Sequence, residues 1–317
     1  MKQGNKIILL IVLLVVSIVF FMTYHMGNNL DYVLSRRSIR LATMTIVGIS
    51  VAFSSVIFQT ITNNRILTPS IMGYESIFIL FQTLIVFFYG DKAFKVISQQ
   101  ENFFYAVLLM LGFSVFMYFL IFGRQRKNIF YLLLMGMVMG TLFNTLSQFL
   151  HVIIDPNEFS IVQNFMFVSF AKMNVKLLGI ATITSIGTLV LTLRYLKYLD
   201  VIALGKDHAI NLGLDYNKLI RTFMLIIALL VSVSTALVGP ITFLGILVTN
   251  LTYELFKTNK HVQTVWLCSA VSCICLITGQ FFVEHILSFS TTVSIVINFV
   301  GGIYFMYLIW SSRKRIS

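Results

Sequence analysis

Charged residues are scarce in this sequence. Asp, Glu, Lys and Arg together make up 11% of the 317 residues, whereas 58% are hydrophobic. A soluble domain of this length carries about a quarter charged residues and uses them to cover its surface. The composition therefore excludes a water-soluble globular protein.

Several chemical signatures are missing as well. The sequence has no Gly-Lys-Ser/Thr phosphate loop, so the chain does not hydrolyse ATP by the usual route. No Cys/His spacing typical of a metal site occurs, and no Ser/His/Asp, Cys/His or paired-carboxylate set indicates catalysis. The three cysteines, Cys268, Cys273 and Cys275, share one apolar segment, which favours burial as small apolar residues over a redox or metal role. A membrane enzyme is thus a poor alternative.

Long apolar stretches fill most of the chain. A bilayer core is about 30 Å thick, so a spanning helix needs ~20 apolar residues. Stretches near this length run from Lys6 to Met26, Ile39 to Thr60, Ile71 to Tyr89, Phe104 to Phe122, Asn128 to Leu150, Leu177 to Leu193, Leu219 to Val238, Gly239 to Leu255, Val262 to Val283, and Val293 to Trp310. We therefore predict an all-α, polytopic membrane protein with about ten transmembrane helices, forming a single domain over 1–317.

The basic residues predict the orientation. With both termini in the cytoplasm, roughly two thirds of the Lys and Arg residues fall on the inner side, as the positive-inside rule requires. The cluster Arg313-Lys314-Arg315 follows the last stretch and anchors the C-terminus there. The first stretch follows Lys2 and Lys6 but has no small-residue cleavage site, so we expect a retained helix. The net charge of +12 thus reflects topology, and nucleic acid is not an expected partner.

Two connections are too long to be simple turns. The external one, His151 to Lys176, contains an apolar run, Phe159 to Phe170, which is too short to cross and predicts a helix at the membrane interface. The internal one, Arg194 to Ile220, predicts a short amphipathic helix bracketed by Gly205 and Gly213. Its polar side mixes charges of both signs, which favours docking on a protein over binding to lipid.

This internal connection carries the most specific pattern in the chain, Leu204-Gly205-x-x-x-Ala209-x-x-Leu212-Gly213. Further motifs occur in the order Arg37-x-x-Arg40, Val47-Gly48, Gln59, Asn64-x-x-x-x-Pro69-x-x-x-Gly73 and Gly239-x-Ile241-x-Phe243-x-Gly245. Together they resemble the FecCD-type (BtuC-like) permease subunits of ABC importers for iron-siderophores, haem and cobalamin. The resemblance covers essentially the whole chain.

Some positions differ from the pattern of that family. Thr249-Asn250-Leu251-Thr252-Tyr253 replaces a common Pro-His-x-x-Arg, Arg65 replaces a proline, and Gln280 to His285 replaces Asp-x-x-x-Arg. These changes resemble the branch that carries catecholate-type ferric siderophores. They also place Glu284 and His285 where the family has an external arginine.

The resemblance implies the partners and the sites that bind them. A coupling segment at about 199–218 would dock on cytoplasmic ABC ATPase subunits, which would bind ATP and Mg while this chain binds no cofactor. The expected contact residues are Leu204, Gly205, Ala209, Leu212 and Gly213. A second permease chain, identical or homologous, would complete the route for the siderophore in the plasma membrane. Arg37 and Arg40 would hold acidic groups of an extracellular substrate-binding lipoprotein, or would only extend to lipid headgroups.

Polar residues within the apolar stretches are candidates for the translocation path or its gate. They are Glu75, Gln59, Ser54, Asn144 and Asn298. A carboxylate in this setting marks a path or a buried hydrogen-bonded group at a helix start, and both readings of Glu75 stay open. The small-residue pairs Gly48 to Ala52 and Gly136 to Gly140 instead predict close helix packing.

Two functions remain on sequence grounds. The first is a permease subunit of an ABC importer for a ferric siderophore. The second is an ion-coupled secondary transporter that acts without an ATPase, which would use Glu75 as its charged group. The coupling-type segment favours the first.

Overall fold

The computed structural model describes residues 3–25, 30–122, 129–170, 174–258 and 260–313. Several basic residues of the topology prediction, Lys2, Arg124, Arg126, Lys127, Lys172, Lys314 and Arg315, lie outside these ranges. The helices are α1 (Gln3–Thr23), α2 (Leu30–Thr62), η1 (Pro69–Met72), α3 (Tyr74–Tyr89), η2 (Gly90–Lys92), α4 (Ala93–Val96), α5 (Gln99–Phe122), α6 (Ile129–Ile153), α7 (Pro156–Met166), α8 (Val175–Ile202), α9 (Lys206–Asn211), α10 (Tyr216–Val238), α11 (Leu244–Leu255), α12 (His261–His285) and α13 (Val293–Arg313).

All regular elements within the described ranges are helical, which confirms the predicted all-α class. Seven of these helices are long and apolar enough to cross a membrane: α1, α2, α5, α6, α8, α10 and α12. Helices α3 and α11 have 16 and 12 residues, and the apolar part of α13 runs only from Val293 to Tyr307. The number of ten crossings is therefore not confirmed by helix length and composition.

Several helices differ from the predicted spans, and in three places the difference has a local reason. Helix α8 continues past Leu193 to Ile202, because charged residues end the apolar stretch without ending the helix. The span predicted from Gly239 becomes helical only at Leu244, since Gly239 has φ 102° and ends α10. Gly73, with φ 85°, likewise separates η1 from α3 within the span predicted from Ile71.

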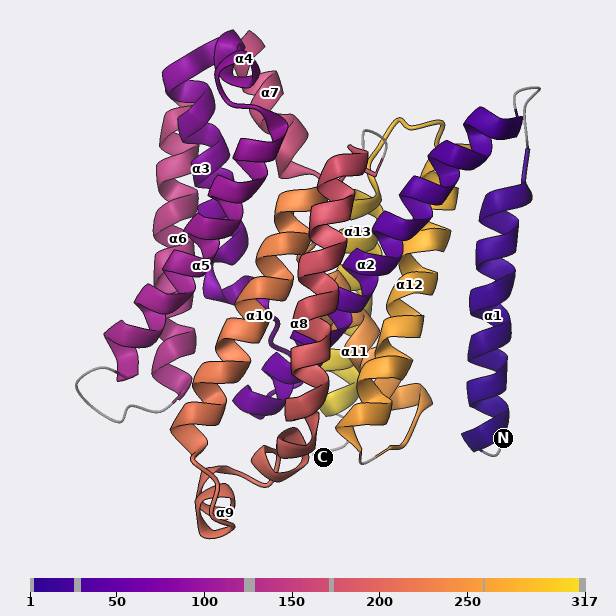
Figure 1. The fold of residues 1–317 in the computed structure, drawn as a ribbon, viewed down its shortest axis with the longest axis vertical. Helices are drawn as coiled ribbons and strands as arrows, with labels where there is room; N and C mark the ends of the chain where they lie inside the picture. The colour runs from indigo at the N-terminus through magenta and orange to yellow at the C-terminus, as the bar shows by residue number, and fades with distance from the viewer. Residues whose placement is uncertain (1–2, 26–29, 123–128, 171–173, 259, 314–317) are drawn as a thin grey trace.

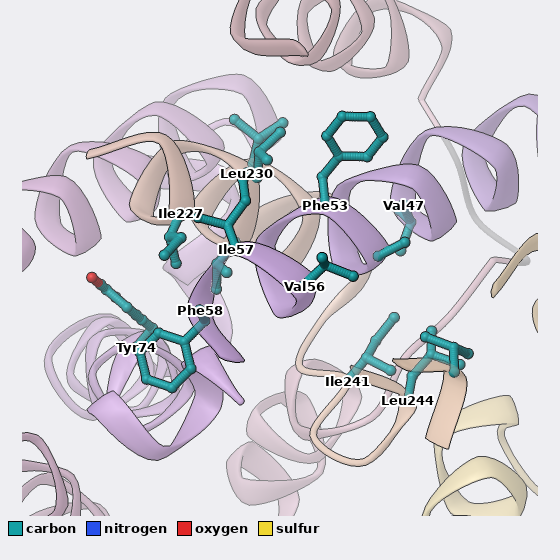
Figure 2. Packing of buried hydrophobic residues seen from close by; sticks show 14 of the residues in the cluster. Val47, Phe53, Val56, Ile57, Phe58, Tyr74, Ile227, Leu230, Ile241 and Leu244 are labelled. Atoms are coloured by element: carbon teal, nitrogen blue, oxygen red, sulfur yellow. The ribbon is translucent and has the colours of Figure 1, made fainter. Parts of the chain in front are cut away.

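Helix α2 is the centre of the packing (Figure 1). Its 33 residues extend over about 50 Å, and it packs mainly against α12 and α10. Figure 2 shows Ile57 of α2 beside Ile227 and Leu230 of α10, and all three are buried. Helix α2 therefore forms the axis against which the other helices pack.

Glycines bring the short elements close to that bundle. A Cβ atom on Gly136 of α6 would lie 2.9 Å from Met72 Cα, and one on Gly140 would lie 3.2 Å from Gly73 Cα. A Cβ atom on Gly48 of α2 would lie 3.2 Å from the Cys273 sulfur of α12. The predicted packing role of these glycines is confirmed, and it places η1 and the start of α3 directly against α6.

The two ends of the bundle carry different elements. The start of α1, the end of α13 and the short helix α9 lie at one end, whereas α4 and α7 lie at the other (Figure 1). Helix α7 is the short helix predicted between Phe159 and Phe170, although it ends at Met166. Short helices therefore lie at both ends of the bundle, α9 at one end and α4 and α7 at the other.

Candidate functional site

Helix α9 projects from the bundle between two glycines. Gly205 precedes it with φ 103° and Gly213 follows it with φ 80°, values that residues with a Cβ rarely adopt. Asp215 then caps α10, because its carboxylate accepts a hydrogen bond of 3.1 Å from Lys218 N. The two turns hold α9 across the ends of α8 and α10, as the sequence predicts for a bracketed amphipathic helix.

The surface of this segment is apolar and exposed. Leu204 is 61% exposed, Ile210 48% and Leu212 63%. Exposure of three large apolar side chains in so short a segment is unfavourable in water, and their burial against a partner would be favourable. We refer to Leu204, Ile210 and Leu212 as the α9 surface.

Ala209 does not belong to the α9 surface, in contrast to the prediction that it contacts the partner. Its side chain is fully buried, and the small side chain lets α9 pack on α8 and α10. Ile210 takes its place as an exposed residue. The alternation of polar and apolar residues does not reveal which apolar side chain faces inward, since that depends on how α9 lies on the bundle.

The α9 region is linked to the rest of the bundle at the end of α8. The Asp200 Oδ1 atom lies 2.6 Å from His261 Nδ1 and accepts a hydrogen bond of 2.9 Å from the backbone N–H of His261. These contacts join α8 to the first residue of α12. Helix α9 therefore packs directly on α8 and α10 and is connected to α12 through this contact.

Arg37 and Arg40, the predicted docking residues, both have partners within the chain. The Arg37 guanidinium is buried and donates hydrogen bonds of 3.0 Å to Met22 O and 2.7 Å to Tyr24 O at the end of α1. Arg40 forms an ion pair with Glu284 at the end of α12. These contacts give both arginines an intramolecular role, and direct binding to an external protein stays a prediction.

Glu75 lies in the first turn of α3, near the interruption between α10 and α11. Its Oε1 atom accepts a hydrogen bond of 2.7 Å from Ser70 Oγ, and its Oε2 atom accepts one of 2.9 Å from Thr242 Oγ1. Glu75 and Ser54 of α2 line the same small cavity. The structure thus brings together two of the predicted path residues.

Gln59 lies elsewhere, at the end of α2. Its Nε2 atom donates hydrogen bonds of 2.9 Å to Arg65 O and 2.8 Å to Thr249 Oγ1 of α11. Asn250 also donates to Arg65 O, at 3.0 Å. These contacts hold the connection after α2 against α11, which is a structural role.

The last two predicted path residues are on separate helices. Asn144 is exposed on α6, and Asn298 of α13 has an Oδ1 atom that is buried without a hydrogen-bond partner. Helix α6 also carries an open apolar groove that is lined by Met137, Val138, Thr141, Leu142, Thr145 and Leu146. The five predicted path residues therefore do not form one site within a single chain.

Sequence reasoning missed most of the hydroxyl residues around Glu75. Ser70, Ser234, Thr235 and Thr242 line its cavity together with Ser55. The adjacent pairs Ser54-Ser55 and Ser234-Thr235 were a usable signal, because paired hydroxyls are unusual in an apolar stretch. The sequence does not reveal that these two pairs, which lie in different predicted spans, meet at one carboxylate.

Known proteins are similar in sequence to this chain over most of its length. A model of the FecCD transport family matches residues 6–311. The petrobactin import system permease protein YclO of Bacillus subtilis (strain 168) is 48% identical over 314 residues, which cover 99% of each chain. The petrobactin import system permease protein FatC of Bacillus anthracis is 33% identical over 283 residues, covering 89% of this chain and 79% of that protein.

A solved structure has the same fold. An inward-facing conformation of a putative metal-chelate type ABC transporter superposes with a TM-score of 0.84 at 22% identity, covering 98% of this chain and 99% of the other. At that identity the match concerns the arrangement of helices. It agrees with the architecture that the sequence motifs imply.

Proposed function

Because the chain belongs to the FecCD transport family, we propose that it is the membrane-spanning permease subunit of an ABC importer for a ferric siderophore of the petrobactin type. The predicted family and the predicted catecholate branch are both confirmed by the relatives. Identity of 48% along essentially the whole chain supports the choice of petrobactin over other siderophores. ATP hydrolysis then belongs to partner subunits.

The observation that carries this proposal is the α9 surface. Leu204, Ile210 and Leu212 are exposed at the end of the bundle that also holds the start of α1. An ATPase subunit that accepts these side chains in a groove would move α9 when it closes on ATP. Since Ala209 is buried against the bundle, α9 would transmit that movement to α8 and α10 instead of bending alone.

A second permease chain would complete the route for the siderophore. The groove on α6 is apolar and open, with Thr141, Thr145 and nearby Asn144 as its polar positions. Facing copies of this groove would line a passage for a bulky chelate with few charged groups. Glu75, Ser54 and Gln59 would support the wall of the passage from inside each chain, and Asn298 would face the other side of the bundle.

The orientation follows from the same arrangement. We place α9 and both termini in the cytoplasm, with ten crossings in the plasma membrane, where α3 with η1 and α11 with residues 239–243 cross as interrupted helices. The opposite end, with α4 and α7, would then receive the substrate-binding lipoprotein. Arg36 is exposed there, whereas Arg37 and Arg40 would hold the outer end of α2 in place for docking.

Uptake and co-purification test the proposal. Cells that lack this chain should lose uptake of iron-labelled petrobactin and keep uptake of a hydroxamate siderophore, and the tagged chain should co-purify with an ATP-binding protein. A second permease in the same preparation would identify a heterodimer. Unchanged uptake of iron-labelled petrobactin would reject this substrate. A chain that purifies alone and transports on an ion gradient would reject the ABC importer.

A further inference from the structure

A cavity lies where two interrupted helices meet α2. The first interruption separates η1 from α3, and the second separates α10 from α11. The cavity between them has a volume of about 20 Å³, enough for one or two particles of the size of a water molecule. Its polar lining consists of Glu75 and seven hydroxyl side chains, those of Ser54, Ser55, Thr68, Ser70, Ser234, Thr235 and Thr242.

Both side-chain oxygens of Glu75 lie within hydrogen-bond distance of a hydroxyl group. Each carboxylate oxygen accepts a hydroxyl hydrogen bond, one from Ser70 and one from Thr242. The ionised form, in which both oxygens are acceptors, fits these contacts. Glu75 forms no ion pair with any Lys, Arg or His among the described residues. A carboxylate in the interior of a membrane protein is costly unless a positive charge balances it.

Two of the lining hydroxyl groups are free to act as ligands. Ser55 and Thr235 are buried and line the cavity, and neither hydroxyl has a hydrogen-bond partner among the described residues. Oxygen atoms of this kind are the ligands that hard cations prefer. Glu75, Ser70 and Thr242 are partly exposed, and an ion would enter the cavity past these residues.

The charge of the lining selects a monovalent ion. Glu75 is the one carboxylate in the cavity lining, and no group of three or more His, Cys, Asp or Glu residues exists among the described residues. A divalent cation would leave a positive charge uncompensated there, whereas an alkali cation balances Glu75. The ligands offer no sulfur or nitrogen atom that would favour a transition metal.

We propose that Glu75 and the surrounding hydroxyls bind one alkali cation, Na⁺ or K⁺. The ion joins α2, α10 and the starts of α3 and α11, four elements that otherwise meet at two breaks in the helical hydrogen bonding. It therefore stabilises the chain at the point where its helices are discontinuous. This role does not depend on which compound the permease carries.

Cation-dependent stability of the purified chain tests the site. Unfolding is followed with a thiol-reactive dye, which reports exposure of buried Cys268 and Cys273. Chloride salts of Na⁺ or K⁺ replace N-methyl-D-glucamine chloride at constant ionic strength. We expect a saturable rise in Tm with Na⁺ or K⁺, because an ion that binds only the folded state stabilises it.

Variants separate the site from a general salt effect. Glu75→Gln should abolish the rise, and Ser55→Ala or Thr235→Ala should raise the half-saturating cation concentration about tenfold, the change expected when a ligand worth about 1.4 kcal/mol is lost. Glu101→Gln removes an exposed carboxylate at the start of α5 and should leave the cation response unchanged.

A direct measurement covers the case in which Glu75→Gln does not fold. Radioactive sodium, displaced by K⁺ or unlabelled Na⁺, should bind the wild-type chain at one ion per chain and bind the Ser55→Ala variant more weakly. The proposal is overturned if Tm is the same in all three salts, if stability follows pH alone, or if the Glu75→Gln variant keeps the response. Association with an ATPase tests the proposed function and is measured separately, so failure of the cation site would leave that proposal standing.

Discussion

Arg40 and Glu284 are 244 positions apart in the chain, and their side chains meet at 2.7 Å between Nη1 and Oε1. The pair joins α2 to the end of α12, with side-chain exposures of 18% and 13%. Arg40 Nε and Glu284 Oε2 are buried without further partners, and the Phe289 ring lies 6.0 Å from the guanidinium. The pair is thus one contact between two largely desolvated charges.

Loss of either partner should destabilise the chain. Glu284→Met leaves Arg40 as an unpaired charge in a desolvated site, which costs about 3 kcal/mol. We expect a clear drop in the Tm of the purified Glu284→Met variant. The double variant Arg40→Met/Glu284→Met should recover most of that loss, because two apolar side chains leave no unpaired charge. A double variant as unstable as the single one would contradict this account.

The α9 surface should determine affinity for the ATPase partner. Leu204→Ala combined with Leu212→Ala removes two exposed apolar side chains and should weaken association at least about tenfold, since burial of each leucine against a partner contributes about 1 kcal/mol or more. Pull-down and transport assays measure the effect. Asp207→Asn, on the same helix, serves as the control that keeps association. Unchanged association of the double variant would place the contact elsewhere.

Gly205 and Gly179 form a matched pair that isolates backbone strain. A Cβ atom at either position would meet no atom within 4 Å, but only Gly205 has a positive φ, of 103°. Gly205→Ala should cost about 1–3 kcal/mol through strain. Gly179→Ala, inside α8, should be neutral or stabilise the helix by about 0.5–1 kcal/mol. Thermal unfolding of both variants measures the difference, and equal Tm values would show that the turn before α9 adapts without cost.

Gly136 should tolerate no side chain, in contrast to Gly112. A Cβ atom on Gly136 would lie 2.9 Å from the Met72 Cα atom, whereas one on Gly112 of α5 would meet nothing within 4 Å. Gly136→Ala must push η1 away from α6, and overpacking of this kind costs about 1–3 kcal/mol. We expect a lower Tm for Gly136→Ala and an unchanged or higher Tm for Gly112→Ala. A stable Gly136→Ala variant would mean that η1 moves freely.

The helical class and the family were predictable because both depend on local information. An apolar stretch long enough to cross a bilayer has to be helical, since lipid offers no partner for free backbone groups. The motif from Leu204 to Gly213 lies within one short segment, so its glycines marked the limits of α9 before any contact was known. Charged residues were less informative about helix ends, as the continuation of α8 beyond Arg194 shows.

Residues that act through distant contacts were not predictable in the same way. Arg40 looked like a free external cation, and Glu284 looked like a change of charge at a docking surface, until the fold paired them. Ala209 was expected at the partner surface and is buried. Glu75 was recognised as unusual, but its neighbours come from α2, η1, α10 and the connection before α11. Apolar length and local motifs are properties of a continuous stretch of chain, whereas these pairings depend on how helices far apart in sequence pack together.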